Sequence, residues 1–345
     1  MEGVGMKVLV TGDKGYIGET LVPLLIENSF EVVGLDTDFF TTTLDASENN
    51  NYKRIVKDIR DVEESDLEGI DAIVHLSALS NDPIGELNPG LTEEINLEAS
   101  VRLAKMAKKV GVKRFIFSSS CSIYGIAKEE TVDESSEVNP LTAYARSKIE
   151  TEKALLGMFD DNFCVGLMRN STVYGYSPKF RNDLVVNNFV TTAIAYGQIR
   201  VMSDGTPWRP LIDVRDLSKI FIEFLKASAE KINGKITNIG FAENNFQVKD
   251  LLDEVKKQLP ECEVVYTGEH GKDSRSYKVN FDQFKSMFPE IKQEWTLDRS
   301  VSDLITHLKN AHYSKEDFEA GTFTRLSVLK QLISQDKVTQ DLRWK

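Results

Sequence analysis

The sequence predicts an α/β fold, with a doubly wound parallel sheet in its first half and a smaller α+β lobe in its second. Over the first 170 residues, short apolar runs alternate with amphipathic helical segments, which is the pattern of parallel β-α-β units. A glycine-rich turn joins the first apolar run to the first helical segment. After about residue 175 the alternation is lost, and prolines separate shorter helical segments.

Six apolar runs are predicted to be strands, because each is short and rich in β-branched or aromatic residues. They are 7–11, 31–35, 55–56, 72–76, 115–117 and 235–239. Helical periodicity predicts helices at 19–28, 93–110, 143–157, 216–226, 248–259, 282–288 and 297–308. Pro23 lies near the start of the first helix, where its missing N–H costs least. Gly111 ends the helix at 93–110, as glycine often does.

The chain length of 345 residues is enough for about two domains. We expect residues 1–175 to form the first domain, joined by a return segment at about 211–241. Residues 176–210 and 242–312 form the second lobe, and 313–345 a helical tail. The tail carries one apolar stripe, Phe323, Leu326, Leu329 and Leu332. We interpret this stripe as packing onto the body or onto another subunit, rather than as a separate binding site.

Composition narrows the possible partners. The chain has 42 basic and 54 acidic residues, a net charge of −12, which does not suit nucleic acid or anionic membranes. An anionic ligand therefore needs a local basic pocket. Cys121, Cys164 and Cys262 have no metal-ligand or C-x-x-C spacing, so we predict no metal site and a reducing compartment. With no long apolar run and no basic-apolar leader, we expect a cytoplasmic protein.

The strongest local motif is a set of three glycines, Gly12, Gly15 and Gly18, directly after the first predicted strand. The first glycine allows a tight turn, the second a close approach of the backbone to a pyrophosphate, and the third close packing of helix on strand. The following helix offers free N–H groups and a partial positive charge to an anion. The motif predicts the dinucleotide site of a Rossmann-type domain.

Two acidic positions extend the prediction to the adenosine half of the dinucleotide. Asp36 ends the second predicted strand, 18 residues after Gly18. A carboxylate there accepts hydrogen bonds from ribose hydroxyls and repels a 2′-phosphate, which favours NAD over NADP. Asp38 is an alternative ligand. Asp58 and Ile59 follow the third predicted strand, where they could flank the adenine ring.

Tyr144 and Lys148 are the candidate catalytic pair. They are four residues apart in a segment that favours helix, so both project from one face. A lysine charge beside the phenol favours the phenolate, a general base for a sugar hydroxyl. Tyr124 and Lys128 have the same spacing, but Gly125 follows Tyr124 and this segment leaves a strand. We prefer Tyr144 because of its place in the chain.

A serine-rich loop, 118–122, follows the fifth predicted strand, where a doubly wound sheet keeps its reactive groups. A hydroxyl in this loop could share the sugar oxygen that Tyr144 deprotonates. The alternative is a serine loop that only caps its own backbone.

Taken together, the motifs resemble the extended short-chain dehydrogenase/reductase family, and more closely its NAD-dependent nucleotide-sugar epimerase/dehydratase branch. The similarity runs in order over about residues 6–310. It rests on Gly12, Gly15, Gly18, Asp36, Asp58, His75-Leu76-Ser77-Ala78, Asn96, Phe117-Ser118-Ser119-Ser120, Tyr144, Lys148 and Leu167-Met168-Arg169.

This resemblance implies a tightly held NAD, a catalytic set of Ser120, Tyr144 and Lys148, and a nucleoside-diphosphate sugar bound by the C-terminal lobe. It also implies a homodimer that pairs helices 93–110 and 143–157. The implied cofactor residues are Gly12, Gly15, Tyr16, Ile17, Gly18, Asp36, Asp58, Ile59, Leu76, Ser77, Ala78, Asn96, Tyr144 and Lys148. The implied substrate residues are Ser120, Thr172, Asn182, Arg209 and Arg275.

Among the substrate residues, Arg209 resembles the family arginine that grips a diphosphate, a task that suits the planar fork of a guanidinium. Arg275 is a second candidate, and Asn182 could reach the same group. A surface ion pair is the alternative for each.

Three departures from the family pattern bear on the reaction. The 4,6-dehydratases of the branch carry an Asp-Glu pair where this chain has Cys121 and Ser122. Without either carboxylate the dehydration lacks its acid and base, and we disfavour it. Epimerases acting at C3 and C5 have a cysteine at the position of Ser122, one residue after Cys121. Thr172 stands where the family often has asparagine.

The resulting hypothesis is an NAD-dependent nucleotide-sugar 4-epimerase that works through a transient 4-keto sugar and reversible hydride transfer. A 4-keto-sugar reductase would use the same residues but consume its cofactor. A third alternative is an NAD-binding regulator that has lost the chemistry, although such a protein would not need Tyr144, Lys148 and Ser120.

Overall fold

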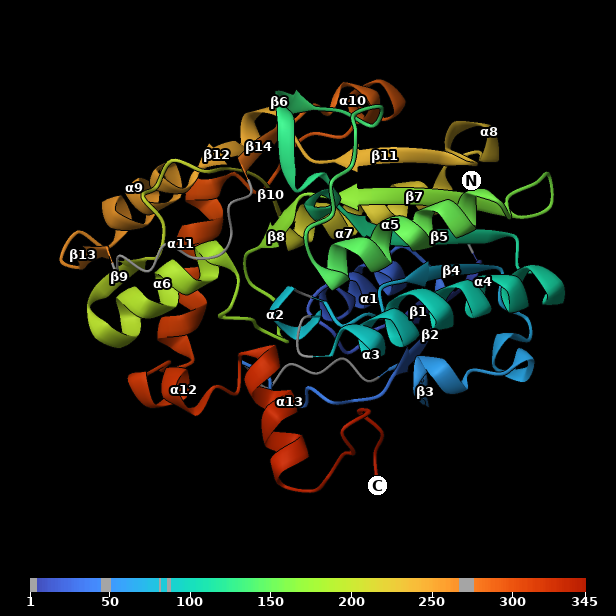
Figure 1. Ribbon diagram of the computed structural model, residues 1–345, viewed down its shortest axis with the longest axis horizontal. Helices are drawn as coiled ribbons and strands as arrows, with labels where there is room; N and C mark the ends of the chain where they lie inside the picture. The colour runs from blue at the N-terminus through green and yellow to red at the C-terminus, as the bar shows by residue number, and fades with distance from the viewer. Residues whose placement is uncertain (1–4, 45–50, 81, 86–87, 267–275) are drawn as a thin grey trace.

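A seven-stranded parallel sheet forms the centre of the protein in the computed structural model (Figure 1). The structure describes residues 5–44, 51–80, 82–85, 88–266 and 276–345. The spatial order of the strands is β11-β7-β5-β4-β1-β2-β3. Their bounds are β1 Lys7–Thr11, β2 Glu31–Asp36, β3 Lys53–Val56, β4 Ala72–His75, β5 Arg114–Ser120, β7 Cys164–Asn170 and β11 Lys235–Ile239. The chain reverses its direction of travel across the sheet between β1 and β4, and ligands of doubly wound sheets bind at such a switch point.

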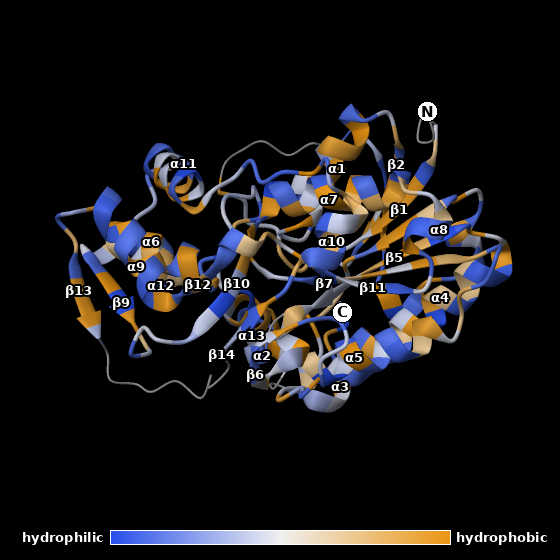
Figure 2. Cartoon of the chain, turned by 90° about the horizontal axis from the view of Figure 1, so that it is seen from above, coloured by the Kyte–Doolittle hydropathy of each residue, from blue (hydrophilic) through white to orange (hydrophobic). Residues whose placement is uncertain are grey.

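Helices cover both faces of this sheet, as Figure 2 shows from above. On one face lie α1 (Gly18–Glu27), α7 (Val214–Lys226) and α10 (Asp282–Met287), with the short α8 (Ala229–Ile232) near the edge strand. On the other lie α3 (Pro89–Glu93), a π-helical turn (Glu94–Glu98), α4 (Ala99–Val110) and α5 (Ala143–Leu156). The short α2 (Asp82–Gly85) lies beside α5.

The strand sequences explain this double covering. In β1, Val8 and Val10 face the core under α1 and α7, whereas Leu9 faces the core under α4. In β5, Phe115 and Phe117 face one core and Ile116 the other. Because successive side chains of a strand point to opposite faces, a continuous apolar run buries both.

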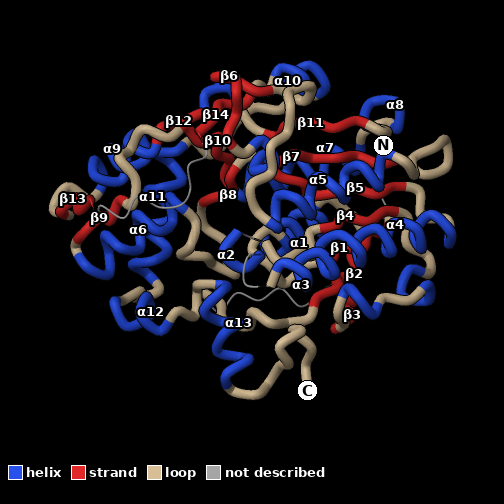
Figure 3. Tube along the Cα trace, in the orientation of Figure 1, coloured by secondary structure: helices blue, strands red, loops and turns tan. Residues whose placement is uncertain are grey.

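A second lobe packs around its own hydrophobic cluster, to the left in Figures 1 and 3. It contains α6 (Val185–Tyr196), α9 (Val248–Gln258) and α11 (Leu297–Asn310), with the parallel pair β9 (Gln198–Val201) and β13 (Glu263–Tyr266). The strands β8 (Thr172–Tyr174), β10 (Trp208–Asp213) and β12 (Asn245–Gln247) form a three-stranded sheet. It connects the two parts, since Leu211 joins the core of the lobe and Ile212 that of the main sheet. A separate pair is β6 (Ile126–Val132) with β14 (Ser276–Val279).

The predicted fold class is confirmed, and each predicted strand corresponds to a strand of the main sheet. The prediction lacked β7 and α6. The predicted helix at 93–110 is interrupted by the π-helical turn, whose Asn96 is buried.

The C-terminal tail contains α12 (Lys315–Ala320) and α13 (Arg325–Ser334), then a terminal turn closed by a bridge between Val338 and Trp344. The apolar stripe packs onto the body, as one of the two predicted possibilities stated. Phe323 joins the core of the lobe, whereas Leu329 is fully buried against the main sheet's helical layer. In Figure 1 the tail forms the lower edge of the molecule, from α12 below the second lobe to the C-terminus.

Within the described ranges, none of the helices has the length and apolarity needed to span a bilayer.

Candidate active site

The glycine turn has the tight geometry that the sequence predicts. Gly12 has a φ of +77°, and its N–H donates to the Leu35 carbonyl at 2.7 Å. A Cβ on Gly18 would lie 2.2 Å from the carbonyl oxygen of Gly12, and a Cβ on Gly15 would lie 3.1 Å from the same atom. The turn therefore has no space for larger residues at 12 and 18. Gly12 and Gly15 are themselves half-buried.

Tyr16, in the same turn, ties the main sheet to the second lobe. Its hydroxyl donates to the Gly175 carbonyl at 2.6 Å and accepts from the Asn187 amide at 3.3 Å. Tyr16 is buried, and burial raises the pKa of its phenol. Ile17, which follows, is half-buried and precedes α1.

Asp36 ends β2 at the same edge of the sheet, as predicted for a ribose ligand. Both hydrogen bonds that it accepts in the described chain, from the Asp38 N–H at 2.9 Å and from the Thr37 hydroxyl, go to Oδ1. Burial and the nearby Asp13 carboxylate raise the pKa of Asp36 to about 6. The Oδ2 atom of Asp36 thus remains for a ligand. Asp38, the alternative, is paired with Arg54.

The glycine turn also holds a buried carboxylate that the sequence analysis did not predict. Asp13 is fully buried and accepts hydrogen bonds from Arg54 Nε at 2.8 Å and from the Tyr52 hydroxyl at 2.7 Å. Gly34 of β2 makes room for it, since a Cβ there would lie 2.2 Å from Asp13 Oδ2. Arg54 of β3 joins Asp13 to Asp38, which fixes the turn to the loop after β2.

Asp58 and Ile59 lie just beyond β3, at the predicted adenine position. The Asp58 carboxylate accepts from the Arg60 backbone N–H and from Arg60 Nη2, both at 2.8 Å. Burial opposes ionisation of Asp58, but the hydrogen bonds and charge of Arg60 outweigh it and lower the pKa. Ile59 is buried beneath.

The loop after β4, with Leu76, Ser77 and Ala78, passes directly over the glycine turn. A Cβ on Gly12 would lie 3.0 Å from the Ser77 nitrogen. Asn96 holds this loop, because its Oδ1 accepts from the Leu79 N–H at 2.8 Å and its Nδ2 donates to the Leu79 carbonyl at 3.2 Å. The structure thus gives Asn96 a role in shaping the loop, and direct contact with a cofactor stays a prediction.

Tyr144 and Lys148 lie together at the start of α5, whose N-cap Thr142 accepts from the Ala145 N–H at 3.1 Å. Lys148 Nζ lies 5.7 Å from the centroid of the Tyr144 ring and donates to the Ser118 carbonyl at 2.7 Å. Burial lowers the pKa of Lys148 to about 8, and the Glu152 carboxylate acts in the opposite direction. The pair therefore combines a phenol with a buried ammonium at the end of β5.

Ser120, the last residue of β5, is half-buried, and its Oγ accepts from the Ser122 N–H at 3.1 Å. It therefore caps its own backbone, which was the alternative considered for this loop, and its hydroxyl proton is still available for donation. Two buried polar atoms in the same region make no hydrogen bond in the described chain, Ser122 Oγ and Asn170 Oδ1. A polar ligand or water there would complete them.

The predicted substrate residues are less closely grouped. Thr172 begins β8 and pairs in register with Leu211, and half-buried Arg209 lies two residues earlier on β10. The amide of Asn182 is engaged by the tail, because its Nδ2 donates to the Tyr313 hydroxyl and its Oδ1 accepts from Thr324. Arg275 lies outside the described residues.

Tyr124, the tyrosine of the alternative catalytic pair at 124 and 128, is buried in the core. The Tyr124 hydroxyl donates to Asn238 Oδ1 at 2.7 Å and accepts from Arg169 Nη1 at 3.0 Å. Cys121 is also buried, its Sγ contacts the Arg169 carbonyl oxygen at 3.1 Å, and burial raises the pKa of its thiol. Neither group is placed for acid-base chemistry.

Arg181 is a candidate site residue that the sequence analysis missed. It is buried, forms a bidentate pair with Asp183 at 2.9 Å, and donates to the Ser80 hydroxyl at 3.4 Å. Its backbone carbonyl accepts from Asn187 Nδ2 at 2.9 Å, and the same amide donates to the Tyr16 hydroxyl, so Arg181 lies close to the glycine turn. The dense alternation of charged residues at 179–183 was the available signal.

A doubly wound sheet with this glycine turn, an acidic residue ending β2 and a Tyr-x-x-x-Lys pair beside β5 defines a dinucleotide-dependent enzyme of the short-chain dehydrogenase/reductase class. The sequence model of the NAD dependent epimerase/dehydratase family matches residues 8–240. The chain belongs to this family, and its cofactor is NAD.

Several curated relatives are similar over most of the chain. The UDP-glucose 4-epimerase of Mycolicibacterium smegmatis is 29% identical, over 68% of this chain and 77% of its own. The UDP-glucuronate 4-epimerase of Thermodesulfobacterium geofontis is 24% identical, over 90% of this chain and 97% of its own. Human dTDP-D-glucose 4,6-dehydratase is 25% identical, over 85% of this chain and 87% of its own. Among solved structures, the UDP-glucose 4-epimerase of Thermotoga maritima with UDP-glucose has a TM-score of 0.77 at 23% identity, over 89% of this chain and all of its own.

Proposed function

We propose that the protein is a nucleotide-sugar 4-epimerase that oxidises C4 of the sugar to a ketone and reduces the ketone from the opposite face. The observation that supports this most directly is the Tyr144–Lys148 pair, which lies at the carboxyl end of β5 with a buried lysine 5.7 Å from the phenol ring. The relatives named UDP-glucose 4-epimerase and UDP-glucuronate 4-epimerase support the same substrate class.

The residues around the glycine turn fit NAD. Glycine at 12 and 18 lets the turn fold tightly into the start of α1, whose first N–H groups suit a diphosphate. Asp36 keeps one carboxylate oxygen for a ribose hydroxyl, and its charge together with that of Asp38 opposes a 2′-phosphate. When bound there, NAD supplies the reversible hydride acceptor of the reaction.

The side chains of α5 and β5 would manage the proton. Tyr144 takes the proton of the C4 hydroxyl on its phenolate oxygen and returns it when the ketone is reduced. Lys148, mostly protonated at pH 7 with a pKa of about 8, favours the phenolate and has N–H groups left for a ribose hydroxyl. Ser120 shares the sugar hydroxyl. The diphosphate of the substrate would be held in the lobe by Arg209, beside Thr172 on the neighbouring strand.

Dehydration is the other reaction named among the relatives. It needs an acid and a base beside C5 and C6, whereas this chain has Cys121 and Ser122 after Ser120. The Cys121 thiol is 1% exposed, and burial raises its pKa. The site therefore favours epimerisation over loss of water.

The test is turnover of a panel containing UDP-glucose, UDP-glucuronate and UDP-N-acetylglucosamine by the purified protein. We expect a 4-epimer of one of them and NAD that stays bound through gel filtration. Tyr144→Phe should lower kcat by at least about a hundredfold, the contribution of a positioned general base, and leave NAD bound. Tyr266→Phe, on an exposed tyrosine of β13, is the matched control and should match wild type. Net consumption of NADH with a 4-keto sugar would instead identify a reductase, and a Tyr144→Phe variant with wild-type turnover would refute the mechanism.

We also propose a homodimer built on α4 and α5, which pack against each other on one face of the sheet and expose polar faces. Such an interface would be isologous. Light scattering after gel filtration should give about twice the 38.9 kDa chain mass, and a monomer at micromolar concentration would contradict the proposal.

A further inference from the structure

The segment 177–183 lies against the glycine turn and the loop after β2. The Ser177 hydroxyl donates to the Tyr16 carbonyl at 2.7 Å. The next two residues contact the loop after β2, because the Pro178 carbonyl accepts from Leu44 N–H and Lys179 Nζ donates to the Thr41 carbonyl, both at 3.0 Å. The segment therefore touches both the turn that would hold a diphosphate and the loop that follows Asp36.

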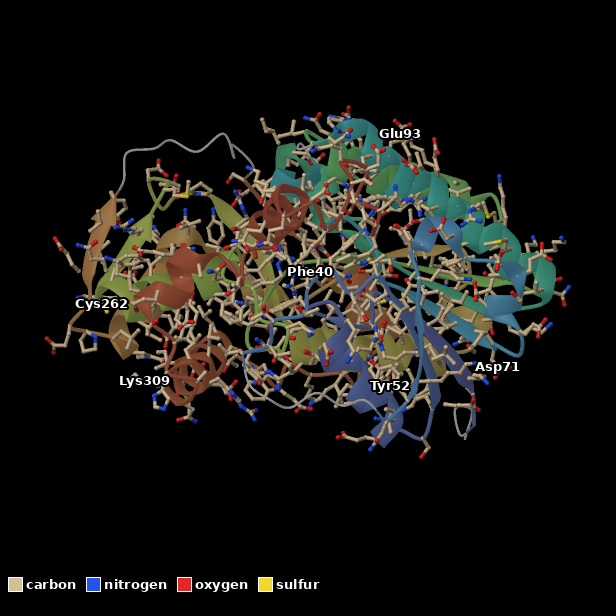
Figure 4. All side chains as sticks on the ribbon, turned by 90° about the horizontal axis from the view of Figure 1, so that it is seen from below. Phe40, Tyr52, Asp71, Glu93, Cys262 and Lys309 are labelled. Carbon is tan, nitrogen blue, oxygen red and sulfur yellow. The ribbon has the colours of Figure 1, made fainter. Side chains whose placement is uncertain are left out.

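Arg325 of the C-terminal tail is inserted at this crossing. It is the first residue of α13 and only 3% exposed. Its Nη2 donates to the Lys179 carbonyl at 2.9 Å, and its guanidinium carbon lies 4.3 Å from the centroid of the Phe40 ring. Phe40, four residues after Asp36, lies near the middle of the molecule in Figure 4. A cation from the far end of the chain thus reaches the loop of the ribose ligand.

Arg325 has no direct counter-ion among the residues that the structure describes. Arg181 has a bidentate carboxylate partner in Asp183, but no carboxylate in the described ranges lies within ion-pair distance of Arg325. Burial and the charge of Arg181 lower the pKa of Arg325 to about 9, while Asp183, Asp36 and Tyr16 act in the opposite direction. A buried cation with a single hydrogen bond is costly unless something else neutralises it.

We propose that Arg325 binds the diphosphate of the dinucleotide, so that the C-terminal tail is a wall of the cofactor site. The inference rests on the proposed function, because it assumes a dinucleotide on the glycine turn. The Arg325 guanidinium contacts Phe40, in the loop that follows Asp36, and the carbonyl of Lys179. Two residues before Lys179, Ser177 is bonded to Tyr16 of the glycine turn. Arg325 therefore lies beside the path that a diphosphate takes from the ribose to the turn. The two phosphate groups would supply the missing negative charge. Their oxygens would accept hydrogen bonds from the planar set of N–H donors of Arg325.

The end of the tail also supports a place for the tail in the cofactor site, because it contacts the two loops that follow β2 and β3. Trp344 Nε1 donates to the Thr37 carbonyl at 2.6 Å, and its ring lies 5.5 Å from that of Phe39. Arg343 pairs with Asp61, and the Leu342 carbonyl accepts from Arg60 Nη2 at 3.0 Å. These contacts hold α13, and with it Arg325, beside the two loops that would flank the adenosine.

A nucleotide-sugar substrate also carries a diphosphate, and the two sources can be separated. Arg325 contacts the loop that follows Asp36, whereas Arg209 lies on β10 in the sheet that joins the lobe. We therefore assign Arg325 to the cofactor. A guanidinium that serves the substrate instead would affect the binding of UDP and not that of ADP.

The experiment compares Arg325→Gln with Arg299→Gln, which removes the same charge from an exposed residue of α11. Bound NADH is displaced by NAD, ADP and adenosine, with fluorescence as readout. For Arg325→Gln we expect binding of NAD and ADP to weaken by about tenfold or more, as for a lost hydrogen bond between charged groups, and adenosine binding to stay at the wild-type value. UDP binding to the NAD-loaded protein should also be unchanged. Equal weakening of adenosine, or weakening of UDP alone, would overturn the assignment.

Trp344→Ala keeps the proposal testable if Arg325→Gln does not fold, because Trp344 is 46% exposed and its removal leaves the cores intact. We expect a folded protein from which NAD dissociates at least about tenfold faster, the effect of losing one hydrogen bond and one ring contact that hold the loop. Unchanged dissociation would contradict the role of the tail. If the wild-type protein binds no NAD, the proposed function itself is wrong. If NAD binds tightly and neither substitution weakens its binding, only the role of Arg325 and the tail is wrong.

Discussion

Replacing Glu152 by glutamine tests the most deeply buried charge pair beneath the candidate active site. Glu152 accepts from Arg169 Nη2 at 2.8 Å, and the two side chains are 1% and 4% exposed. The Ser119 hydroxyl donates to the same carboxylate. In Glu152→Gln the guanidinium stays buried without its counter-charge. Breaking a buried pair from one side costs about 3–5 kcal/mol, so we expect a loss of this size in the free energy of unfolding.

Two variants calibrate this result in urea unfolding followed by circular dichroism. Glu150→Gln lies on the same helix but breaks an exposed pair with Lys153, at 49% and 61% exposure, and should cost no more than about 1 kcal/mol. Replacing both Glu152 and Arg169 by methionine removes both charges at similar volume and should recover most of the loss. If Glu152→Gln is within about 1 kcal/mol of Glu150→Gln, the buried pair does not stabilise the fold as expected.

The same substitution has an effect on activity that a purely structural pair would not have. The Glu152 carboxylate holds up the pKa of Lys148, which burial lowers to about 8. Without that carboxylate the pKa falls further, so Lys148 loses its proton at lower pH. The alkaline limb of the kcat profile should move to lower pH in Glu152→Gln, and stay in place in Glu150→Gln.

Three further predictions concern single residues. NAD affinity should fall about tenfold between pH 7 and pH 5, because the pKa of Asp36 is about 6 and only the carboxylate accepts hydrogen bonds from ribose hydroxyls. Calorimetry should show this fall for the wild type and an affinity independent of pH for Asp36→Asn. Gly18→Ala places a Cβ 2.2 Å from the Gly12 carbonyl and should abolish NAD retention in gel filtration, whereas Gly90→Ala, with its nearest atom at 3.6 Å, should retain it; equal retention would contradict the tight turn. Cys121→Ser should keep at least about half of kcat, since a buried thiol of raised pKa is no acid or base; a folded, inactive variant would show otherwise.

The parts of the site that the sequence predicted are those set by local spacing. Gly12, Gly15 and Gly18 follow a strand within one turn, and Tyr144 and Lys148 share a helical face. Both relationships depend on the spacing of residues within one or two turns of the backbone, and that spacing can be read from the sequence.

The parts that it missed depend on contacts between distant segments. Arg54 pairs with Asp13, 41 positions away, and Arg325 donates to the Lys179 carbonyl, 146 positions away. Nothing in the local sequence distinguishes these arginines from solvated ones. Arg325 is buried because the tail folds against Lys179 and Phe40.

Two missed elements have a related cause. Helix α6 (Val185–Tyr196) is rich in valine and threonine, which favour strands, and its burial in the lobe overrides that preference. Strand β7 contains Gly166, which suits no strand by propensity but leaves room for Ile116, whose Cδ1 would lie 3.1 Å from an added Cβ.

The most direct test of the account follows deuterium at C4 of the sugar during turnover of UDP-[4-²H]glucose and the corresponding glucuronate and N-acetylglucosamine compounds. If Tyr144 removes only the hydroxyl proton, the hydrogen on C4 never exchanges with water, and NMR should find the 4-epimer with its deuterium retained at C4. An epimer that has lost its deuterium to solvent, or the absence of any 4-epimer, would contradict the account.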